Sequence, residues 1–82
     1  MDITIFSTSI CAICHAEMKW FDKKGIGYNH VVVDESDEAM DQFMKATDGM
    51  IQSPPFTVIN KEDGSVVKIA GFDQKKLLTA IA

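Results

Sequence analysis

Two cysteines separated by two residues are the part of this chain best suited to chemistry. Cys11 comes after residues 2–6, which are rich in β-branched side chains, and directly before a helix-like run over 12–24 that contains Cys14. Cys11 is therefore expected where a strand ends and a helix begins. Unpaired N–H groups there carry partial positive charge, so a thiol loses its proton more readily and becomes a nucleophilic thiolate. Cys14 lies one turn further on, so the pair could pass two electrons to another disulfide.

Three other interpretations of these residues remain open. Cys-x-x-Cys-His is also the signature of covalent haem attachment, with His15 as a ligand, but that chemistry needs export and no signal peptide is evident. Zinc could use both cysteines with His15 and His30, although their spacing matches no common closed zinc site. The pair could also be structural and take no part in chemistry. The strand-then-helix context favours a redox pair over all three.

Length, charge and cysteine count narrow the class of protein. The 82 residues predict one domain spanning 1–82, expected to be a monomer. The net charge is −4, with eight lysines and no arginine, which disfavours nucleic-acid binding. No apolar run approaches the roughly 18 residues of a membrane span, so no membrane partner is expected. We expect a cytoplasmic location, where thiols stay reduced and two cysteines are a poor structural staple.

The helix that follows Cys11 is expected over 12–24, ending before Gly25, which is a favourable residue just past a helix end. Apolar residues at helical spacing predict its inner face, and Glu17 is assigned to the polar face. The predicted inner residues are Ile13, Ala16, Trp20 and Phe21, with Met18 beside them.

A second strand is expected over 28–33, where three consecutive valines are typical of a strand buried on both faces. His30 is expected on its surface without a special role. Strand, helix and strand in this order predict a right-handed parallel crossover. A second helix is expected over 34–48, with Ser36 as its N-cap. Its predicted inner residues are Met40, Phe43, Met44 and Thr47.

Two prolines then precede a strand expected over 56–60, and a turn at 61–64 predicts a hairpin with a fourth strand over 65–69. Asp73 is expected to cap a last short helix. The predicted inner residues of that helix are Leu77, Leu78 and Ile81.

The order βαβαββα, with Cys-x-x-Cys after the first strand, resembles the thioredoxin superfamily. The Pro-then-strand and Gly-Phe-Asp segments look most like glutaredoxins and the glutaredoxin-like redoxins that feed electrons to ribonucleotide reductase. The resemblance covers the whole chain. It implies an α/β fold of the thioredoxin-like, glutaredoxin type, with a four-stranded mixed sheet flanked by three helices. The implied sheet order is second, first, third and fourth strand, with the last two antiparallel to the first two.

The resemblance also implies roles for individual residues. Cys11 would be the nucleophile and Cys14 the resolving thiol, while Pro55 would be the cis-proline that faces them. Pro54 would lend backbone groups to a substrate lying along residues 53–56. The remaining residues of the implied substrate-binding set are Thr8, Ile13, Gly71, Phe72 and Asp73, with Asp73 in the acidic position near the glutamyl end of glutathione.

Several positions depart from the family pattern. Thr8 stands where glutaredoxins usually carry lysine, and Ala12-Ile13 replaces the usual Pro-Tyr between the cysteines. Pro54 has no N–H, so one backbone hydrogen bond to glutathione cannot form. Ile5 occupies the position of the buried acid of thioredoxin, which leaves the helix N-terminus to activate Cys11.

The implied activity is thiol–disulfide exchange with no tightly bound cofactor and no metal. The reductant would be glutathione or a disulfide reductase such as thioredoxin reductase. The substrate would be a protein disulfide, with ribonucleotide reductase one candidate, or a glutathione mixed disulfide. An alternative is a redoxin-fold binding module, for example a carrier of a [2Fe–2S] cluster bridged between two chains.

Overall fold

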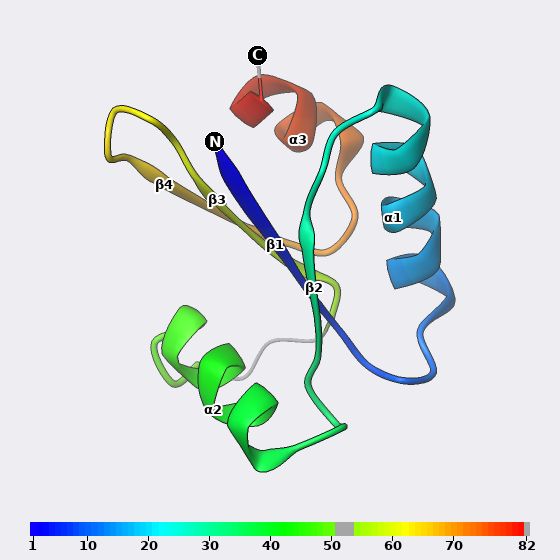
Figure 1. Ribbon diagram of the computed structural model, residues 1–82, viewed down its shortest axis with the longest axis vertical. Helices are drawn as coiled ribbons and strands as arrows, with labels where there is room; N and C mark the ends of the chain where they lie inside the picture. Colours follow the sequence, from blue (N-terminus) through cyan, green and yellow to red (C-terminus); the bar gives the residue numbers. More distant parts are fainter. Residues whose placement is uncertain (51–53, 82) are drawn as a thin grey trace.

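The structure is a computed structural model that describes residues 1–50 and 54–81 (Figure 1). A four-stranded sheet is flanked by three helices, which confirms the α/β, thioredoxin-like architecture expected from the sequence. In chain order the elements are β1 (Asp2–Ser7), α1 (Ala12–Lys24), β2 (Asn29–Val32), α2 (Asp37–Ala46), β3 (Phe56–Asn60), β4 (Val66–Ala70) and α3 (Gln74–Ile81).

The strand order β2-β1-β3-β4 is the one expected. β1 pairs with β2 in parallel and with β3 in antiparallel, so that Phe6 lies between Val31 and Phe56. β4 pairs antiparallel with β3 and therefore runs in the same direction as β1. The expectation that both last strands oppose the first two was wrong for β4, because the hairpin reverses the chain once more after β3.

The prediction that β2 is buried on both faces was also wrong. β2 is an edge strand with a single neighbour, and Val31 and Val32 are only half-buried. Val33, just beyond the strand, is the fully buried valine of the three. An apolar run alone does not distinguish a central strand from an edge strand whose side chains border two cores.

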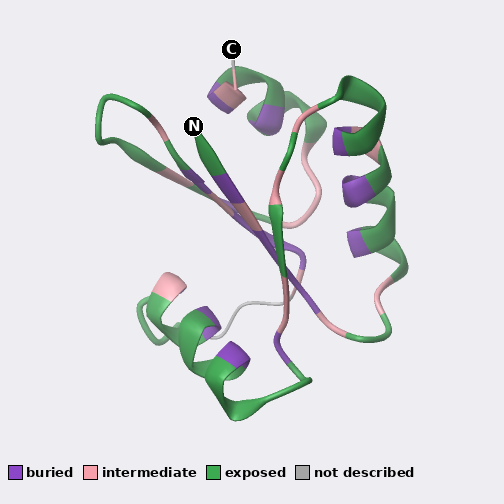
Figure 2. Ribbon diagram, viewed as in Figure 1, coloured by how far each residue is buried: buried purple, intermediate pink, exposed green. Residues whose placement is uncertain are grey.

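The sheet separates two cores, because α1 and α3 lie on one face and α2 lies on the other (Figure 1). Figure 2 shows the buried residues of the helices turned toward the strands. The core under α1 and α3, which we call the cysteine core, contains Ile3, Ile5, Cys14, Met18, Phe21, Ile59, Ile69, Leu77 and Ala80. The core under α2, which we call the aromatic core, contains Phe6, Val33, Phe43 and Phe56.

The inner face of α1 differs from the predicted one. Its buried residues follow the spacing i, i+3, i+4, i+7 from Cys14, which is the period of one helix face. They are Cys14, Glu17, Met18 and Phe21. Ile13 is 58% exposed and Ala16 is also exposed, so both assignments to the inner face were wrong. Because Cys14 faces the core, Glu17, which lies three residues later on the same face of α1, is buried as well. The sequence prediction had placed Glu17 on the polar face.

In α2 the predicted cap is confirmed, since Ser36 Oγ accepts a hydrogen bond from the N–H of Ala39 at 3.1 Å. The helix is shorter than the predicted 34–48. Met40 and Met44, predicted to face inward, are each 41% exposed. The prediction is confirmed for Phe43 and for Thr47, the C-cap residue, which are both buried, and Ala39 is buried in addition.

In α3 the cap is likewise confirmed, because Asp73 Oδ1 accepts a hydrogen bond from the N–H of Lys76 at 3.1 Å. Leu77 and Ala80 are buried and Ile81 is half-buried, whereas Leu78, predicted to face inward, is exposed. No helix within the described ranges is long and apolar enough to cross a membrane.

Candidate active site

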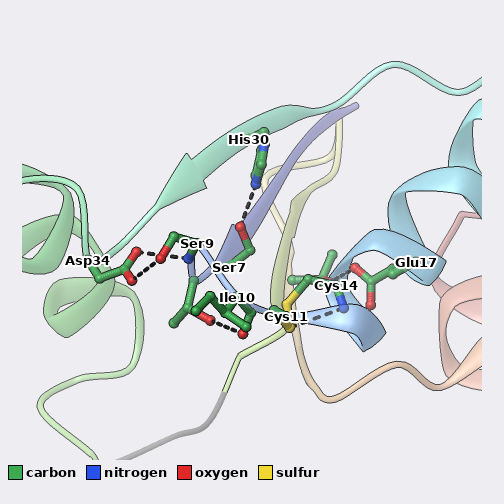
Figure 3. Close-up of a disulfide and its surroundings, with 10 residues drawn as sticks. Ser7, Ser9, Ile10, Cys11, Cys14, Glu17, His30 and Asp34 are labelled. Carbon is green, nitrogen blue, oxygen red and sulfur yellow. Dashed lines mark hydrogen bonds between the residues drawn. A yellow bond between two sulfur atoms is a disulfide. The ribbon is translucent and has the colours of Figure 1, made fainter.

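Cys11 is the N-cap residue of α1, and it forms a disulfide with Cys14 (Figure 3). The two Cα atoms are 5.3 Å apart, as expected for cysteines one helical turn apart. The N–H of Cys14 donates a hydrogen bond to Cys11 Sγ at 3.1 Å. In the reduced protein the same N–H and the positive end of the helix would stabilise a thiolate on Cys11. The first turn holds no acidic residue to oppose this.

The two sulfur-bearing residues differ sharply in exposure. Cys14 is 1% exposed and belongs to the cysteine core, whereas Cys11 is half-buried and only borders that core. A substrate disulfide can therefore reach Cys11 but not Cys14. This asymmetry is what an attacking cysteine and a resolving cysteine require.

The loop before Cys11 is tied to the end of β2. Ser9 donates two hydrogen bonds to Asp34, from its N–H to Oδ1 at 2.9 Å and from its Oγ to Oδ2 at 2.6 Å. The bond from the Ser9 hydroxyl is the main cause that lowers the pKa of Asp34. Ser7 Oγ and His30 Nε2 form a further hydrogen bond between β1 and β2. These contacts hold the position of the loop that delivers Cys11 to the helix.

The Pro54–Pro55 peptide bond is cis, and Pro55 is buried while Pro54 is half-buried. The N–H of Gly71 donates a hydrogen bond to the carbonyl oxygen of Pro55 at 2.8 Å, which joins the Gly-Phe-Asp turn to this proline. Gly71 has a φ of 79°, a conformation that favours glycine. The predicted substrate alignment along 53–56 lies partly outside the described residues, because residue 53 is not among them.

Phe72 connects this turn to α1. Its ring lies edge-on to that of Trp20, with centroids 6.2 Å apart, and both rings border the cysteine core. Asp73 uses its carboxylate to cap α3, so it already has a backbone partner. A shallow pocket of about 330 Å³ lies between α1 and the start of α3. It is lined by Ala16, Lys19, Trp20, Lys23, Phe72 and Gln74.

Not all of the predicted site residues converge. Cys11, Cys14 and Phe72 meet at one core, and Pro55 is joined to the same region through Gly71. Thr8 donates its hydroxyl to the carbonyl oxygen of Ile10 at 3.2 Å, a contact within its own loop. Within the described residues, the hydrogen bonds of Thr8 and Asp73 do not reach the cysteines or Pro55, and Ile13 is exposed.

Exposed apolar side chains lie beside the nucleophile. Ile10, directly before Cys11, is 93% exposed, and Ile13, between the cysteines, is 58% exposed. Single exposed apolar residues are common, but two next to a reactive sulfur form an apolar border around it. Such a border suits contact with another polypeptide.

Sequence reasoning missed Glu17, which is completely buried. Thr57 Oγ1 on β3 donates a hydrogen bond to Glu17 Oε2 at 2.5 Å, and Oε1 has no partner among residues 1–50 and 54–81. Burial raises the pKa of Glu17, and the hydrogen bond from Thr57 partly opposes this. The available signal was the helical spacing, since Glu17 lies three residues after Cys14 on the stripe that continues to Met18 and Phe21.

The four ligands of the zinc hypothesis are not gathered at one point. His15 is exposed on α1, and His30 on β2 is bonded to Ser7. Among the described residues, no group of three or more His, Cys, Asp or Glu side chains is placed to share a metal ion.

A family model described as Glutaredoxin matches residues 3–63 of the chain. No curated protein matches this chain. Among solved structures, a mutant of the thioredoxin-like protein BC3987 has a TM-score of 0.77 at 25% identity, covering 99% of this chain and 100% of that one. The glutaredoxin-like NrdH-redoxin from Escherichia coli has a TM-score of 0.73 at 24% identity, covering 96% and 93%. A glutaredoxin from Archaeoglobus fulgidus has a TM-score of 0.73 at 19% identity, covering 98% and 85%.

Proposed function

Because this chain belongs to the glutaredoxin family, we propose that it is a dithiol oxidoreductase that donates electrons to protein disulfides. The Cys11 thiolate attacks one sulfur of the substrate disulfide, forms a mixed disulfide and releases the other substrate sulfur as a thiolate. The Cys14 thiolate then attacks Cys11 Sγ and releases the second substrate thiolate. Two electrons pass to the substrate, and the Cys11–Cys14 disulfide remains.

The observation that carries this proposal is the unequal placement of the two sulfurs. Cys11 caps α1, accepts a hydrogen bond from the N–H of Cys14 and is partly accessible, while Cys14 is buried behind it. One sulfur is thus stabilised as a nucleophile, and the other is protected from everything except Cys11. A structural disulfide would need neither feature.

Two further observations favour a protein substrate over glutathione. Pro54 can accept a backbone hydrogen bond but cannot donate one, and Thr8 supplies no positive charge for a glutathione carboxylate. The exposed side chains of Ile10 and Ile13 offer apolar contact that a polypeptide can use and a small charged tripeptide cannot. Pro55, Gly71, Phe72 and Asp73 complete the proposed substrate-binding region.

We propose that the oxidised protein is reduced again by a flavin disulfide reductase of the thioredoxin reductase type, with glutathione as a slower alternative. The NrdH-redoxin from Escherichia coli is described as having a thioredoxin-like activity profile, which agrees with this choice. Ribonucleotide reductase is one protein disulfide worth testing. No tightly bound cofactor is needed, and a cytoplasmic monomer is the simplest working form, because cytosolic thiols are kept reduced.

Insulin reduction driven by dithiothreitol tests the activity directly. The wild-type protein should accelerate precipitation of the insulin B chain, and Cys11→Ser should abolish the acceleration. Cys14→Ser should instead accumulate a mixed disulfide with insulin, detectable by mass spectrometry. Activity that survives in Cys11→Ser would rule the proposal out.

A comparison of reductants tests the substrate preference. The oxidised protein is incubated with NADPH and either thioredoxin reductase or glutathione with glutathione reductase, and NADPH consumption is followed. We expect faster consumption with thioredoxin reductase. Equal or faster turnover with glutathione would contradict the preference while leaving the dithiol mechanism intact.

A further inference from the structure

A buried carboxyl group next to the resolving cysteine has no part in the exchange described so far. Glu17 is fully buried, and it is the one buried side chain within the described residues that can carry a charge. In the part of the chain that the structure describes, Thr57 donates a hydrogen bond to Glu17 Oε2, while Oε1 has no partner. Buried polar atoms are nearly always hydrogen-bonded, so an unpaired carboxyl oxygen calls for a chemical explanation.

Glu17 is placed to reach Cys14. Residues three apart on a helix share one face, and helical side chains lean toward the N-terminus of the helix. The side chain of Glu17 therefore extends back over the turn that holds Cys14, and both residues belong to the buried face of α1 (Figure 3). Thr57, on β3, holds the Oε2 oxygen by its hydrogen bond and leaves Oε1 free.

Cys14 needs a proton acceptor. In the reduced protein it must become a thiolate before it can attack Cys11. Because Cys14 is 1% exposed, bulk water has almost no access to its proton. The core around it is otherwise uncharged: β1 contributes Ile5, β3 contributes Ile59, β4 contributes Ile69 and α3 contributes Leu77.

We propose that the Glu17 carboxylate accepts the proton of the Cys14 thiol during resolution of the mixed disulfide. This inference rests on the proposed dithiol function. The S–H bond of Cys14 breaks as an O–H bond forms on Glu17, and the resulting thiolate forms the S–S bond with Cys11 while the substrate thiolate leaves. When a reductase dithiol later attacks Cys11, Cys14 leaves as a thiolate and takes the same proton back from Glu17.

The environment of Glu17 suits this exchange. Burial raises its pKa above that of an exposed glutamate, which brings its proton affinity closer to that of a thiol. The hydrogen bond from Thr57 acts in the opposite direction and keeps the carboxylate form accessible. The two effects together give a group that can both take and return a proton.

Stopped-flow reaction of the reduced protein with dithiobis(nitrobenzoate) separates the two chemical steps. Attack by Cys11 releases one coloured thiolate, and resolution by Cys14 releases the second. In the wild type, the rate of the second phase should rise with pH and then level off once Glu17 is ionised. In Glu17→Gln this phase should slow about 10- to 100-fold at neutral pH, the scale of general base catalysis, and should lose the plateau. The first phase should stay unchanged.

Two further variants make the test specific. Thr57→Val removes the hydrogen bond that lowers the pKa of Glu17, so the inflection of the second phase should move to higher pH while its plateau remains. Asp22→Asn neutralises an exposed carboxylate on the same helix and should change neither phase. Circular dichroism checks the fold of each variant, and Thr57→Val keeps the inference testable if Glu17→Gln does not fold.

The possible failures are distinguishable. A second phase in Glu17→Gln with the wild-type rate and pH profile would overturn the role of Glu17 and leave the dithiol function standing. Equal slowing of both phases would also overturn it, because Glu17 would then act only on structure. Failure of the wild type to release either thiolate would overturn the proposed function, and this inference with it.

Discussion

The two cores differ in what their side chains can do. The aromatic core under α2 consists of three phenylalanines and a valine, with ring centroids 5.6 to 6.5 Å apart. The cysteine core under α1 and α3 is mostly aliphatic around the ring of Phe21, but it also holds a disulfide sulfur, and a buried carboxyl and its threonine partner lie beside it. The side under α2 thus contributes packing alone, while the side under α1 and α3 also contains polar and sulfur-bearing groups that can react. The sheet keeps the two requirements apart.

The largest expected effect is on the aromatic side. Phe43→Ala should lower the free energy of unfolding by about 3–5 kcal/mol, since it removes a ring that contacts both Phe6 and Phe56. The folded fraction should retain wild-type rates in both phases of the disulfide reaction. Urea denaturation and the stopped-flow assay measure the two quantities. A change in the chemical rates of the folded protein would break the separation between the cores.

Making the cysteine side resemble the aromatic side should have the opposite effect on stability. The double variant Glu17→Met/Thr57→Val replaces a buried carboxyl and its partner by apolar groups of similar size. It should raise the free energy of unfolding at neutral pH by about 1–3 kcal/mol, the range for removing an unsatisfied buried polar group. Urea denaturation of the oxidised protein measures this. A less stable double variant would show that the Glu17–Thr57 contact is itself stabilising.

The pH dependence of stability should arise from the cysteine core side of the sheet and not from the aromatic core. The folded-state pKa of Glu17 is raised above 4.5, so the folded protein binds this proton more tightly than the unfolded chain. Stability should therefore fall as pH rises from about 4.5 through the folded-state pKa, and no such cost should exist below that range. Glu17→Gln should flatten this fall, whereas Phe43→Ala should leave its shape unchanged. Thermal melts of the oxidised proteins across pH are the measurement.

The smallest expected effect concerns the substrate region on the cysteine side. Pro54→Val restores a backbone N–H and so one hydrogen bond to an extended substrate, worth about 0.5–1.5 kcal/mol. Glutathione-dependent reduction of a small mixed disulfide should become roughly three- to ten-fold more efficient. Thr8→Lys should add to this gain. The control is Ser36→Ala, which changes the N-cap of α2 on the opposite face of the sheet and should leave the rate unchanged. If neither Pro54→Val nor Thr8→Lys raises the rate, these residues do not explain weak glutathione use.

Much of the fold could be predicted because local signals agreed with one another. Gly25 ends α1 in the left-handed conformation, and Ser36 caps α2 as its residue type suggests. Lys61 and Ser65 close the predicted hairpin through the hydrogen bond from the N–H of Lys61 to the carbonyl oxygen of Ser65. Such signals depend on a few neighbouring residues, so they survive without knowledge of the tertiary structure.

The errors arose where tertiary contacts decide the outcome. Apolar residue type suggested that Ile13 faces inward and Glu17 outward, but the burial of Cys14 sets the rotation of α1 and reverses both. Met40 and Met44 were misplaced for a similar reason, because Ala39 and Phe43 are the residues of α2 that are buried against the sheet. The first-strand position that carries a buried acid in thioredoxin is Ile5 in this chain, whose buried acid, Glu17, lies on α1. A strand-based comparison could not find it.

The unequal exposure of the two sulfurs has a practical consequence for labelling. We expect a bulky alkylating reagent to modify a single cysteine of the reduced and folded protein, because Cys14 is almost fully enclosed while Cys11 is not. A maleimide dye or a cross-linker would therefore attach at one defined atom without any cysteine being removed by mutation. Denaturant would reveal the second thiol, so the ratio of labels gained before and after unfolding becomes a direct count of folded molecules.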